Sequence, residues 1–316
     1  MKVLLTGVAG FIGSHVAERL LADGWDVVGL DNFDDFYDPS IKRANVDRFH
    51  SHQAFQLVEA DIRDRAALDA IARGGKLDGV VHLAARAGVR PSLERPRDYM
   101  DTNLAGTTEL LELVQRSEIP KFVFGSSSSV YGEREGSPFR EDDNVDFPVS
   151  PYAATKKAGE LLCYTYHHNF AIAISCLRFF TVYGPRQRPE MAIHKFTRLI
   201  DEGKPVTLYG DGTSRRDYTF VADIVEGVVA ALERAKGYKI YNLGNNRTVE
   251  LNELIHLLEK NIGKKAKIER LPPQPGDVPL TCADIEQARR DLGYNPAVPI
   301  ELGLEQFVEW FKKTRK

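Results

Sequence analysis

A tyrosine and a lysine four residues apart can place acid–base chemistry at one point of the molecule. Tyr152 and Lys156 frame the segment YAATK. On a helix, residues at this spacing share a face, so the phenol and the ammonium group would converge. A free tyrosine has a pKa near 10, and lowering it to about 7 for a useful base corresponds to roughly 4 kcal/mol. A nearby ammonium group acts in that direction because it stabilises the phenolate.

A run of four serines strengthens this interpretation, since a YxxxK segment alone is common on ordinary helices. Ser126, Ser127, Ser128 and Ser129 follow the apolar run 122–124. Four hydroxyl groups in a row are poor strand material, and they are natural hydrogen-bond donors and acceptors for a sugar. Ligand crevices of open α/β sheets lie beyond the carboxyl ends of the strands, so we expect the serines to line such a crevice.

The first 13 residues carry a second kind of site, a glycine loop. The segment TGVAGFIG spans Thr6 to Gly13 and lies between an expected strand and an expected helix. Gly7 would permit the tight turn, Gly10 the close approach of a pyrophosphate, and Gly13 close packing of helix on strand. The start of the helix would offer free N–H groups to the phosphates. This context predicts a dinucleotide site.

An acidic residue after the second apolar run indicates which dinucleotide binds. The carboxylate of Asp31 can accept both ribose hydroxyls of NAD, and it would repel the 2′-phosphate of NADP. Asp61, after the next apolar run, is a weaker candidate for the adenine amino group. The other expected cofactor contacts are Phe11, Ile12, Asn32, Ile62, Leu83, Ala84 and Ala85.

The elements that must position these residues follow an alternating pattern. Short runs that are apolar at consecutive positions occur at 3–5, 27–30, 80–83, 122–124 and 171–174. Such strands are buried on both faces, which is typical of a parallel sheet covered by helices. Helical patterns at 14–23 and 102–117 lie between them. We therefore predict an α/β fold, a Rossmann-type doubly wound parallel sheet.

The pattern loosens after about residue 180, where prolines punctuate short strands (206–209, 238–243) and helices (220–234, 251–262, 302–313). We predict an NAD-binding Rossmann domain over residues 1–180. Residues 181–316 would form a smaller α+β region that mainly binds substrate, with some segments returning to the sheet.

Composition narrows the function classes. The 316 residues include 42 Lys plus Arg and 45 Asp plus Glu, a net charge of −3, which argues against a nucleic-acid binder. The three scattered cysteines form neither a disulfide framework nor a metal site. No apolar run approaches the roughly 20 residues that span a bilayer, and the N-terminus is a poor signal peptide. We expect a cytoplasmic protein with neither metal nor membrane partner.

The motifs together resemble those of the extended short-chain dehydrogenases/reductases, the NAD-dependent sugar epimerase/dehydratase family. The matching segments are TGVAGFIG, HLAARAGVR, FGSSSSVYG, SPYAATK, RFFTVYGP, RRDYTFVADI and QPGDVPLTCADI, and they cover nearly the whole length. The resemblance implies that Tyr152 removes the proton from the sugar O4 while hydride leaves C4 for a retained, recycled NAD. It also implies that Lys156 holds the nicotinamide ribose and that Ser127 bridges to O4.

Within the family, the stretches at 31–38 (DNFDDFYD) and 188–192 (RPEMA) are similar to the subgroup that epimerises UDP-glucuronate to UDP-galacturonate at C4. Related 4,6-dehydratases have an Asp-Glu pair where this chain has Ser128 and Ser129, and decarboxylases have Glu at the second position. Hydroxyls of Ser127, Ser128 and Thr181 could accept the C6 carboxylate with no carboxylate nearby to repel it.

The resemblance also assigns the anchors of the nucleotide. Arg216 matches the family arginine on the pyrophosphate, and guanidinium geometry suits phosphate oxygens. Arg188 and then Arg90 are further candidates, and Asp277 matches the acid that meets the uridine ribose. A homodimer joined through helices near 102–117 and 152–168 is implied as well.

Three alternatives stay open at this point. The sugar could be UDP-glucose/UDP-galactose or an N-acetylated UDP-hexosamine, since Thr281 is small where some relatives have a bulky residue and leaves room for a larger substituent. The reaction could be decarboxylation of UDP-glucuronate. The chain could also be a non-catalytic dinucleotide sensor, although such proteins typically lose the Tyr/Lys pair.

Overall fold

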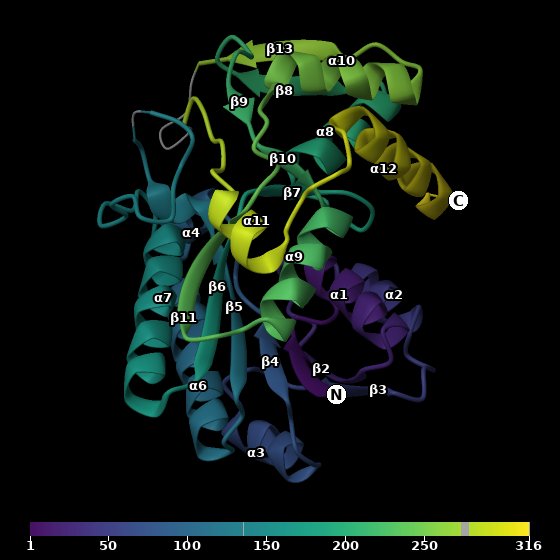
Figure 1. The fold of residues 1–316 in the computed structure, drawn as a ribbon. Helices are drawn as coiled ribbons and strands as arrows, with labels where there is room; N and C mark the ends of the chain where they lie inside the picture. The colour runs from purple at the N-terminus through teal and green to yellow at the C-terminus, as the bar shows by residue number, and fades with distance from the viewer. Residues whose placement is uncertain (135, 273–277, 316) are drawn as a thin grey trace.

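Seven parallel strands form the central sheet, in the order β11-β6-β5-β4-β1-β2-β3 (Figure 1). The computed structural model describes residues 1–134, 136–272 and 278–315. The strands are β1 (Lys2–Thr6), β2 (Asp26–Asp31), β3 (Phe55–Glu59), β4 (Gly79–His82), β5 (Lys121–Ser127), β6 (Ala173–Phe179) and β11 (Tyr238–Leu243). The strand order reverses between β1 and β4, which confirms the predicted doubly wound fold and locates its ligand crevice.

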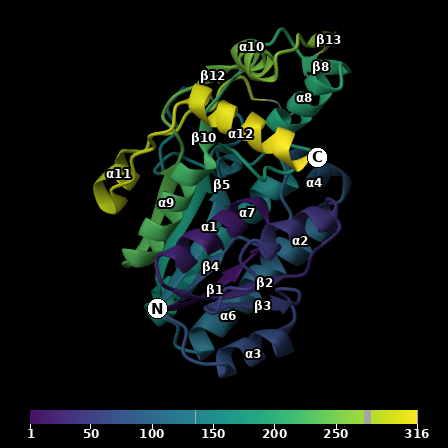
Figure 2. The ribbon, with the colours of Figure 1, turned by 90° about the vertical axis from the view of Figure 1, so that its right-hand side faces the viewer.

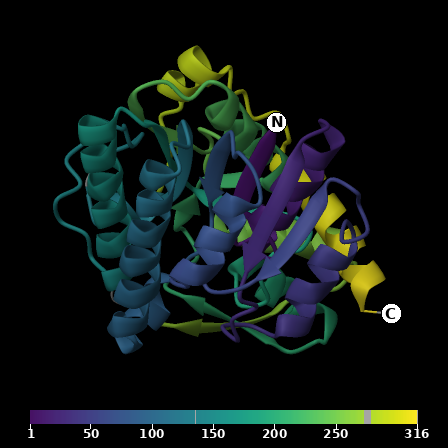
Figure 3. The ribbon, with the colours of Figure 1, turned by 90° about the horizontal axis from the view of Figure 1, so that it is seen from below.

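The strands are apolar at consecutive positions because helices cover both faces of the sheet. Val3, Leu4 and Leu5 of β1 are fully buried, and so are Val80 and Val81 of β4. Helices α1 (Phe11–Ala22) and α9 (Val221–Glu233) contact each other on one face (Figure 2), where α1 also contacts α2 (Pro39–Asp47). Helices α3 (Arg65–Arg73), α6 (Gly106–Arg116) and α7 (Pro151–Phe170) cover the other face, with α6 beside α7 (Figure 3).

The second half of the chain forms a smaller α+β region above the carboxyl ends of the central strands (Figure 1). It contains three two-stranded sheets: β7 (Thr181–Tyr183) with β10 (Tyr218–Phe220), β9 (Arg215–Arg216) with β12 (Val249–Glu250), and β8 (Pro205–Tyr209) with β13 (Lys267–Leu271). Its helices are α8 (Ala192–Asp201), α10 (Leu251–Ile262), α11 (Glu286–Leu292) and α12 (Ile300–Thr314). Strand β11 from this half pairs with β6, so the chain does return to the central sheet.

Two local expectations differ from the structure. The segment expected as one helix over 102–117 begins in a π-helical turn, η1 (Met100–Ala105), which follows α4 (Val89–Glu94) and α5 (Pro96–Tyr99) and leads into α6. The serine run was expected to lie outside a strand, but Ser126 and Ser127 end β5, and the 3₁₀ turn η2 (Ser128–Tyr131) follows. The buried hydroxyl of Ser126 is tolerated because it donates to Glu160 Oε1 at 2.7 Å. In the described ranges, no helix is both long and apolar enough to cross a membrane.

Candidate active site

A cavity of about 670 Å³ opens where the carboxyl ends of the central strands meet the smaller region. Its volume is within the range of small-molecule sites. Every predicted site residue that the structure describes lines it, from Gly7 and Asp31 at one end to Ser127, Tyr152 and Arg216 at the other. Asp277 lies outside the described residues. The topology therefore brings the predicted dinucleotide loop and the predicted catalytic residues into one space.

The glycine loop has room only for glycine at two of its positions. Gly7 has a φ of +71°, and a Cβ there would lie 2.7 Å from the backbone nitrogen of Ala84. A Cβ on Gly13 would lie 2.0 Å from the carbonyl oxygen of Gly7. Gly13 thus allows α1 to begin directly against the turn, which refines the expectation that it only brings helix and strand together. Gly10 also lines the cavity, and it is less crowded: a Cβ there would lie 3.1 Å from the same oxygen.

Asp31 is held at the end of β2, and its carboxylate can accept further hydrogen bonds. Its carboxylate accepts from the backbone N–H of Ala9 at 3.0 Å and of Phe33 at 2.9 Å. Burial raises its pKa, and the two N–H donors oppose that rise. Each carboxylate oxygen has one bond here and can accept another. The side chain is therefore fixed in orientation and able to receive two hydroxyl groups.

Asp61 lines the cavity but is fully engaged by its neighbours. Its two oxygens accept four hydrogen bonds, from the backbone and side chain of Arg63 at 2.7–2.9 Å and from Asn32 Nδ2 at 2.9 Å. The Arg63 bond holds the pKa of this carboxyl below its usual value. A carboxylate has about four acceptor positions, so an adenine amino group would have to displace one of these donors.

Tyr152, in the first turn of α7, meets the end of β5. The Ser127 hydroxyl is hydrogen-bonded to its phenol oxygen, and it also bonds Ser129 Oγ at 2.9 Å. Tyr99 packs edge-on against the Tyr152 ring, with centroids 6.1 Å apart. Ser150 begins the helix by accepting from the backbone N–H of Ala153 at 3.1 Å. The phenol is therefore fixed in one orientation toward the cavity.

The electrostatics of Tyr152 differ from the sequence-based expectation. Burial raises the pKa of the phenol, while Ser127 and the charge of Arg188 act to lower it. Lys156 was expected to supply the lowering. Its Nζ instead donates to the carbonyl oxygen of Gly125 at 2.7 Å and lies 6.0 Å from the centre of the Tyr152 ring. The side chains by themselves therefore leave the phenol protonated at neutral pH.

Lys156 shares the cavity face of α7 with Tyr152, as the spacing predicted. It is 5% exposed, and this burial lowers its pKa to about 8. The ammonium group thus keeps its proton at neutral pH, with two donor hydrogens left for a ligand.

Cationic and hydroxyl side chains line the opposite wall. Arg188 pairs with Glu190 at 3.1 Å and lies over the Phe36 ring at 5.9 Å. Arg216, in β9, donates to its neighbour's carbonyl oxygen at 3.1 Å. The guanidinium of Arg90, in α4, lies 5.0 Å from the centre of the Tyr209 ring, and Thr181, at the start of β7, completes this wall. Such a wall suits a ligand that carries phosphates.

Several lining residues were not singled out from the sequence. Arg86 reaches Asp34 at 2.8 Å, and Lys42 lies over the Tyr37 ring at 4.7 Å. The loop after β2 therefore forms part of the wall, although its residues 33–38 were used only to suggest a subgroup. Behind the wall, Asn103 of η1, which does not line the cavity, donates to Thr155 Oγ1 of α7 at 3.0 Å, and no spacing rule predicts this link.

A glycine loop with the Asp31 carboxylate at the end of β2, together with Tyr152 and Lys156 of α7 facing Ser127 at the end of β5, is the arrangement of a dinucleotide-dependent site on a Rossmann-type sheet. Residues 4–307 match the family model described as GDP-mannose 4,6 dehydratase. The chain belongs to this family of extended short-chain dehydrogenases/reductases.

Comparisons with three individual proteins point to the UDP-sugar 4-epimerases within this family. The chain is 46% identical to a UDP-glucuronate 4-epimerase of Thermodesulfobacterium geofontis, over 98% of this chain and 96% of that protein. The crystal structure of a UDP-glucuronic acid 4-epimerase from Bacillus cereus, in complex with UDP-glucuronic acid and NAD, superposes with a TM-score of 0.94 at 40% identity, covering 99% of this chain and 100% of that one. A UDP-glucose 4-epimerase from Thermotoga maritima with UDP-glucose gives 0.92 at 32% identity, covering both chains fully.

Proposed function

We propose that the protein is an NAD-dependent 4-epimerase that interconverts UDP-glucuronate and UDP-galacturonate. One observation carries the proposal: the phenol of Tyr152 is hydrogen-bonded to Ser127 in a cavity that also holds the glycine loop and Arg216. The relatives that act on UDP-glucuronate, at 40–46% identity over nearly the whole chain, support the choice of sugar.

The cavity fits NAD at its glycine-loop end. The space above Gly7 and Gly13 exists because neither carries a Cβ, and the first turn of α1 presents backbone N–H groups to a pyrophosphate. Asp31 would hold the adenosine ribose, and Lys156 the nicotinamide ribose. When bound, NAD would supply the acceptor for the hydride that leaves C4 of the sugar, and a positive charge near the Tyr152 phenol. Residues 1–180 would form the NAD-binding domain, and residues 181–316 would mainly hold the UDP-sugar.

The chain's own residues would handle the proton of the sugar O4. Tyr152 would take this proton as the C4–O4 bond gains double-bond character and return it when the hydroxyl reforms. Ser127, bonded to the same phenol oxygen, would bridge to O4. Arg216 and Arg188 would anchor the diphosphate, so that the sugar can turn while the nucleotide stays fixed.

The serine end of the cavity suits a carboxylate at C6. Ser127, Ser128 and Thr181 present hydroxyls there. The carboxylates among the described lining residues are Asp31, Asp34 and Asp61 near the cofactor end and Glu190, which pairs with Arg188. The family's dehydratase and decarboxylase reactions use an acid at the position of Ser128 or Ser129, so epimerisation is the better match.

Rates on different UDP-sugars test the choice of substrate. We expect kcat/KM for UDP-glucuronate to exceed that for UDP-glucose and for UDP-N-acetylglucosamine by at least about ten-fold, because the hydroxyls are unmatched without a carboxylate. Thr181→Val keeps the side-chain shape, and it should lower kcat/KM for UDP-glucuronate about ten-fold. Equal turnover of UDP-glucose, the reaction of the Thermotoga relative, would refute the choice of the uronate.

We also infer a cytoplasmic homodimer. All three cysteines are free thiols, which suits a reducing compartment. The outer face of α7 exposes about half of each of the Leu161 and Tyr164 side chains, and α6 lies beside it. Two such helix pairs would form a four-helix interface. Sedimentation should give the mass of two chains for the wild type and of one chain for Leu161→Glu/Tyr164→Glu. A monomeric wild type at micromolar concentration would contradict the dimer.

A further inference from the structure

Three residues of α7, each four positions after the last, meet the last three residues of β5. Tyr152 bonds the Ser127 hydroxyl. Lys156 Nζ donates to the Gly125 carbonyl oxygen at 2.7 Å, and Glu160 Oε1 accepts from Ser126 Oγ at 2.7 Å. Residues at this spacing share one face of a helix. Glu160 is therefore the third member of the row that contains the catalytic tyrosine and lysine.

The helix and the strand lie unusually close at this row. A Cβ on Gly159 would lie 2.4 Å from Cζ of the Phe124 ring, so the approach depends on a glycine next to Glu160. Sliding α7 along β5 would break the Lys156, Glu160 and Tyr152 bonds together. The position of the phenol relative to Ser127 is thus tied to the bond between Glu160 and Ser126.

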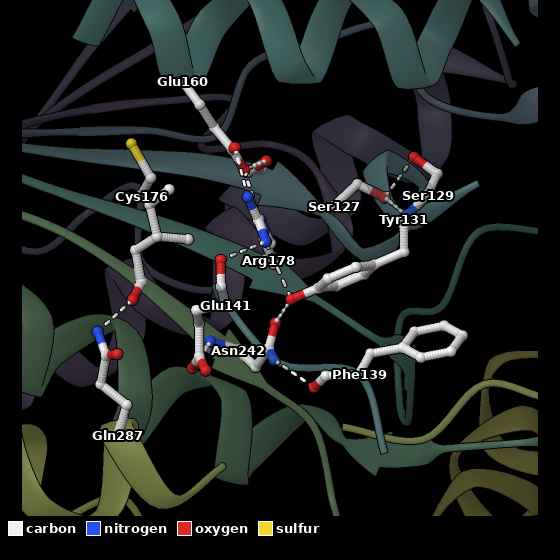
Figure 4. A network of polar contacts seen from close by, with 12 residues as sticks. Ser127, Ser129, Tyr131, Phe139, Glu141, Glu160, Cys176, Arg178, Asn242 and Gln287 are labelled. Carbon is white, nitrogen blue, oxygen red and sulfur yellow. Dashed lines mark hydrogen bonds and ion pairs between the residues drawn. The ribbon is translucent and has the colours of Figure 1, made fainter. Parts of the chain in front are cut away.

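Glu160 is itself fixed by a buried ion pair (Figure 4). Arg178 of β6 donates to it twice, from Nε to Oε1 and from Nη2 to Oε2, both at 2.9 Å, and both side chains are 1% exposed. The Nη1 of Arg178 donates to Tyr131 Oη at 3.0 Å, and that hydroxyl donates to Asn242 Oδ1 at 2.7 Å. The pair therefore joins α7, β5, β6, η2 and β11 behind the cavity, which neither Glu160 nor Arg178 lines.

We propose that Glu160, held by Arg178, is a positioning residue of the epimerase: it sets Ser127 against Tyr152 through Ser126 and places a negative charge one helical turn from Lys156. This inference rests on the proposed function. Buried ion pairs are weak sources of stability, so a gain in stability alone is a poor reason for the Glu160–Arg178 pair.

Charge supports the second half of the proposal. Burial lowers the pKa of Lys156 to about 8, and Cys163 and then Glu160 oppose that lowering. The other titratable groups close to the ammonium are Tyr152 and Cys163 on α7 and His82 on β4. Burial raises the pKa of Tyr152 and of Cys163, and it lowers the pKa of His82 to about 3. All three are therefore uncharged at pH 7, and Glu160, although paired with Arg178, is the anion near the lysine.

Two substitutions separate positioning from charge. Ser126→Ala removes one hydrogen bond and keeps the Glu160–Arg178 pair; we expect kcat to fall at least three-fold with KM for UDP-glucuronate and the pH profile unchanged. Glu160→Gln removes the charge as well; we expect kcat to fall at least ten-fold and its alkaline limb to move to lower pH, because Lys156 loses its anion. Asp69→Asn, which breaks the remote Arg116 ion pair between α6 and α3, is the control and should change stability only.

A measurement that does not depend on turnover distinguishes failure of this inference from failure of the proposed function. The ¹³Cε resonance of Lys156 in the NAD-loaded protein should titrate at lower pH in Glu160→Gln than in the wild type. If wild-type protein epimerises nothing, the proposed function fails while this titration still reports on Glu160. Should Glu160→Gln not fold, Ser126→Ala decides the positioning role. Wild-type kcat in Ser126→Ala, or a wild-type lysine titration in folded Glu160→Gln, would overturn the inference.

Discussion

Tyr152→Phe is expected to lower kcat for epimerisation of UDP-glucuronate by about 10²–10⁴-fold, the usual contribution of a positioned base. The substitution removes the oxygen that bonds Ser127 and leaves the ring packed against Tyr99. The fold should therefore persist, and the Kd for UDP, measured by calorimetry, should change less than about three-fold.

A tyrosine on the same helix provides the matched control. Tyr164 does not line the cavity, and Tyr164→Phe keeps its ring on the outer face of α7, so this variant should keep wild-type kcat. If Tyr152→Phe retained more than about a tenth of the wild-type rate, another group would have to accept the O4 proton, and the assignment of the base would be wrong.

Gly13→Ala is expected to remove most of the bound NAD. The new Cβ would lie 2.0 Å from the Gly7 carbonyl oxygen, and a backbone atom cannot move aside as a flexible side chain can. Overpacking of this kind costs about 1–3 kcal/mol. If the loop distorts by that amount, NAD affinity falls about 5- to 150-fold. NAD released from denatured, purified protein can be quantified by its absorbance or by enzymatic cycling.

Gly74→Ala is a suitable control for this experiment, because Gly74 ends α3 away from the cavity and its Cβ would lie 3.2 Å from the nearest atom. It should retain the wild-type NAD content. A Gly13→Ala protein with full NAD content and an unchanged melting temperature would show that the crowding at Gly13 does not shape the cofactor loop.

Residues whose role depends on local spacing could be predicted from the sequence. The glycine loop, Asp31 and the Tyr152–Lys156 pair all lie within short segments whose geometry is set by one turn or one helix. Each of them lines the cavity as expected. The consecutive apolar residues of β1 and β4 predicted the covered parallel sheet for a similarly local reason, since a strand that is buried on both faces has no polar side.

Contacts between distant segments could not be predicted in this way. The saturation of Asp61 by Arg63 and Asn32, and the bond from Lys156 to Gly125 in place of a direct effect on Tyr152, depend on how loops and helices meet in space. Glu160 joins the catalytic row only because Gly159 allows α7 to approach β5 and because Arg178 arrives from β6. The serines at the end of β5 were not expected in a strand for the same reason: Glu160, which accepts the hydrogen bond of Ser126, is 34 residues away in the sequence.

The most direct test of the central claim is the fate of the C4 hydrogen. Purified protein, with no NAD added, should convert UDP-glucuronate deuterated at C4 into UDP-galacturonate, and NMR should find the deuterium still at C4 because the hydride returns to the carbon it left. An unchanged substrate, or a product whose C4 hydrogen comes from water, would contradict an NAD-dependent 4-epimerase.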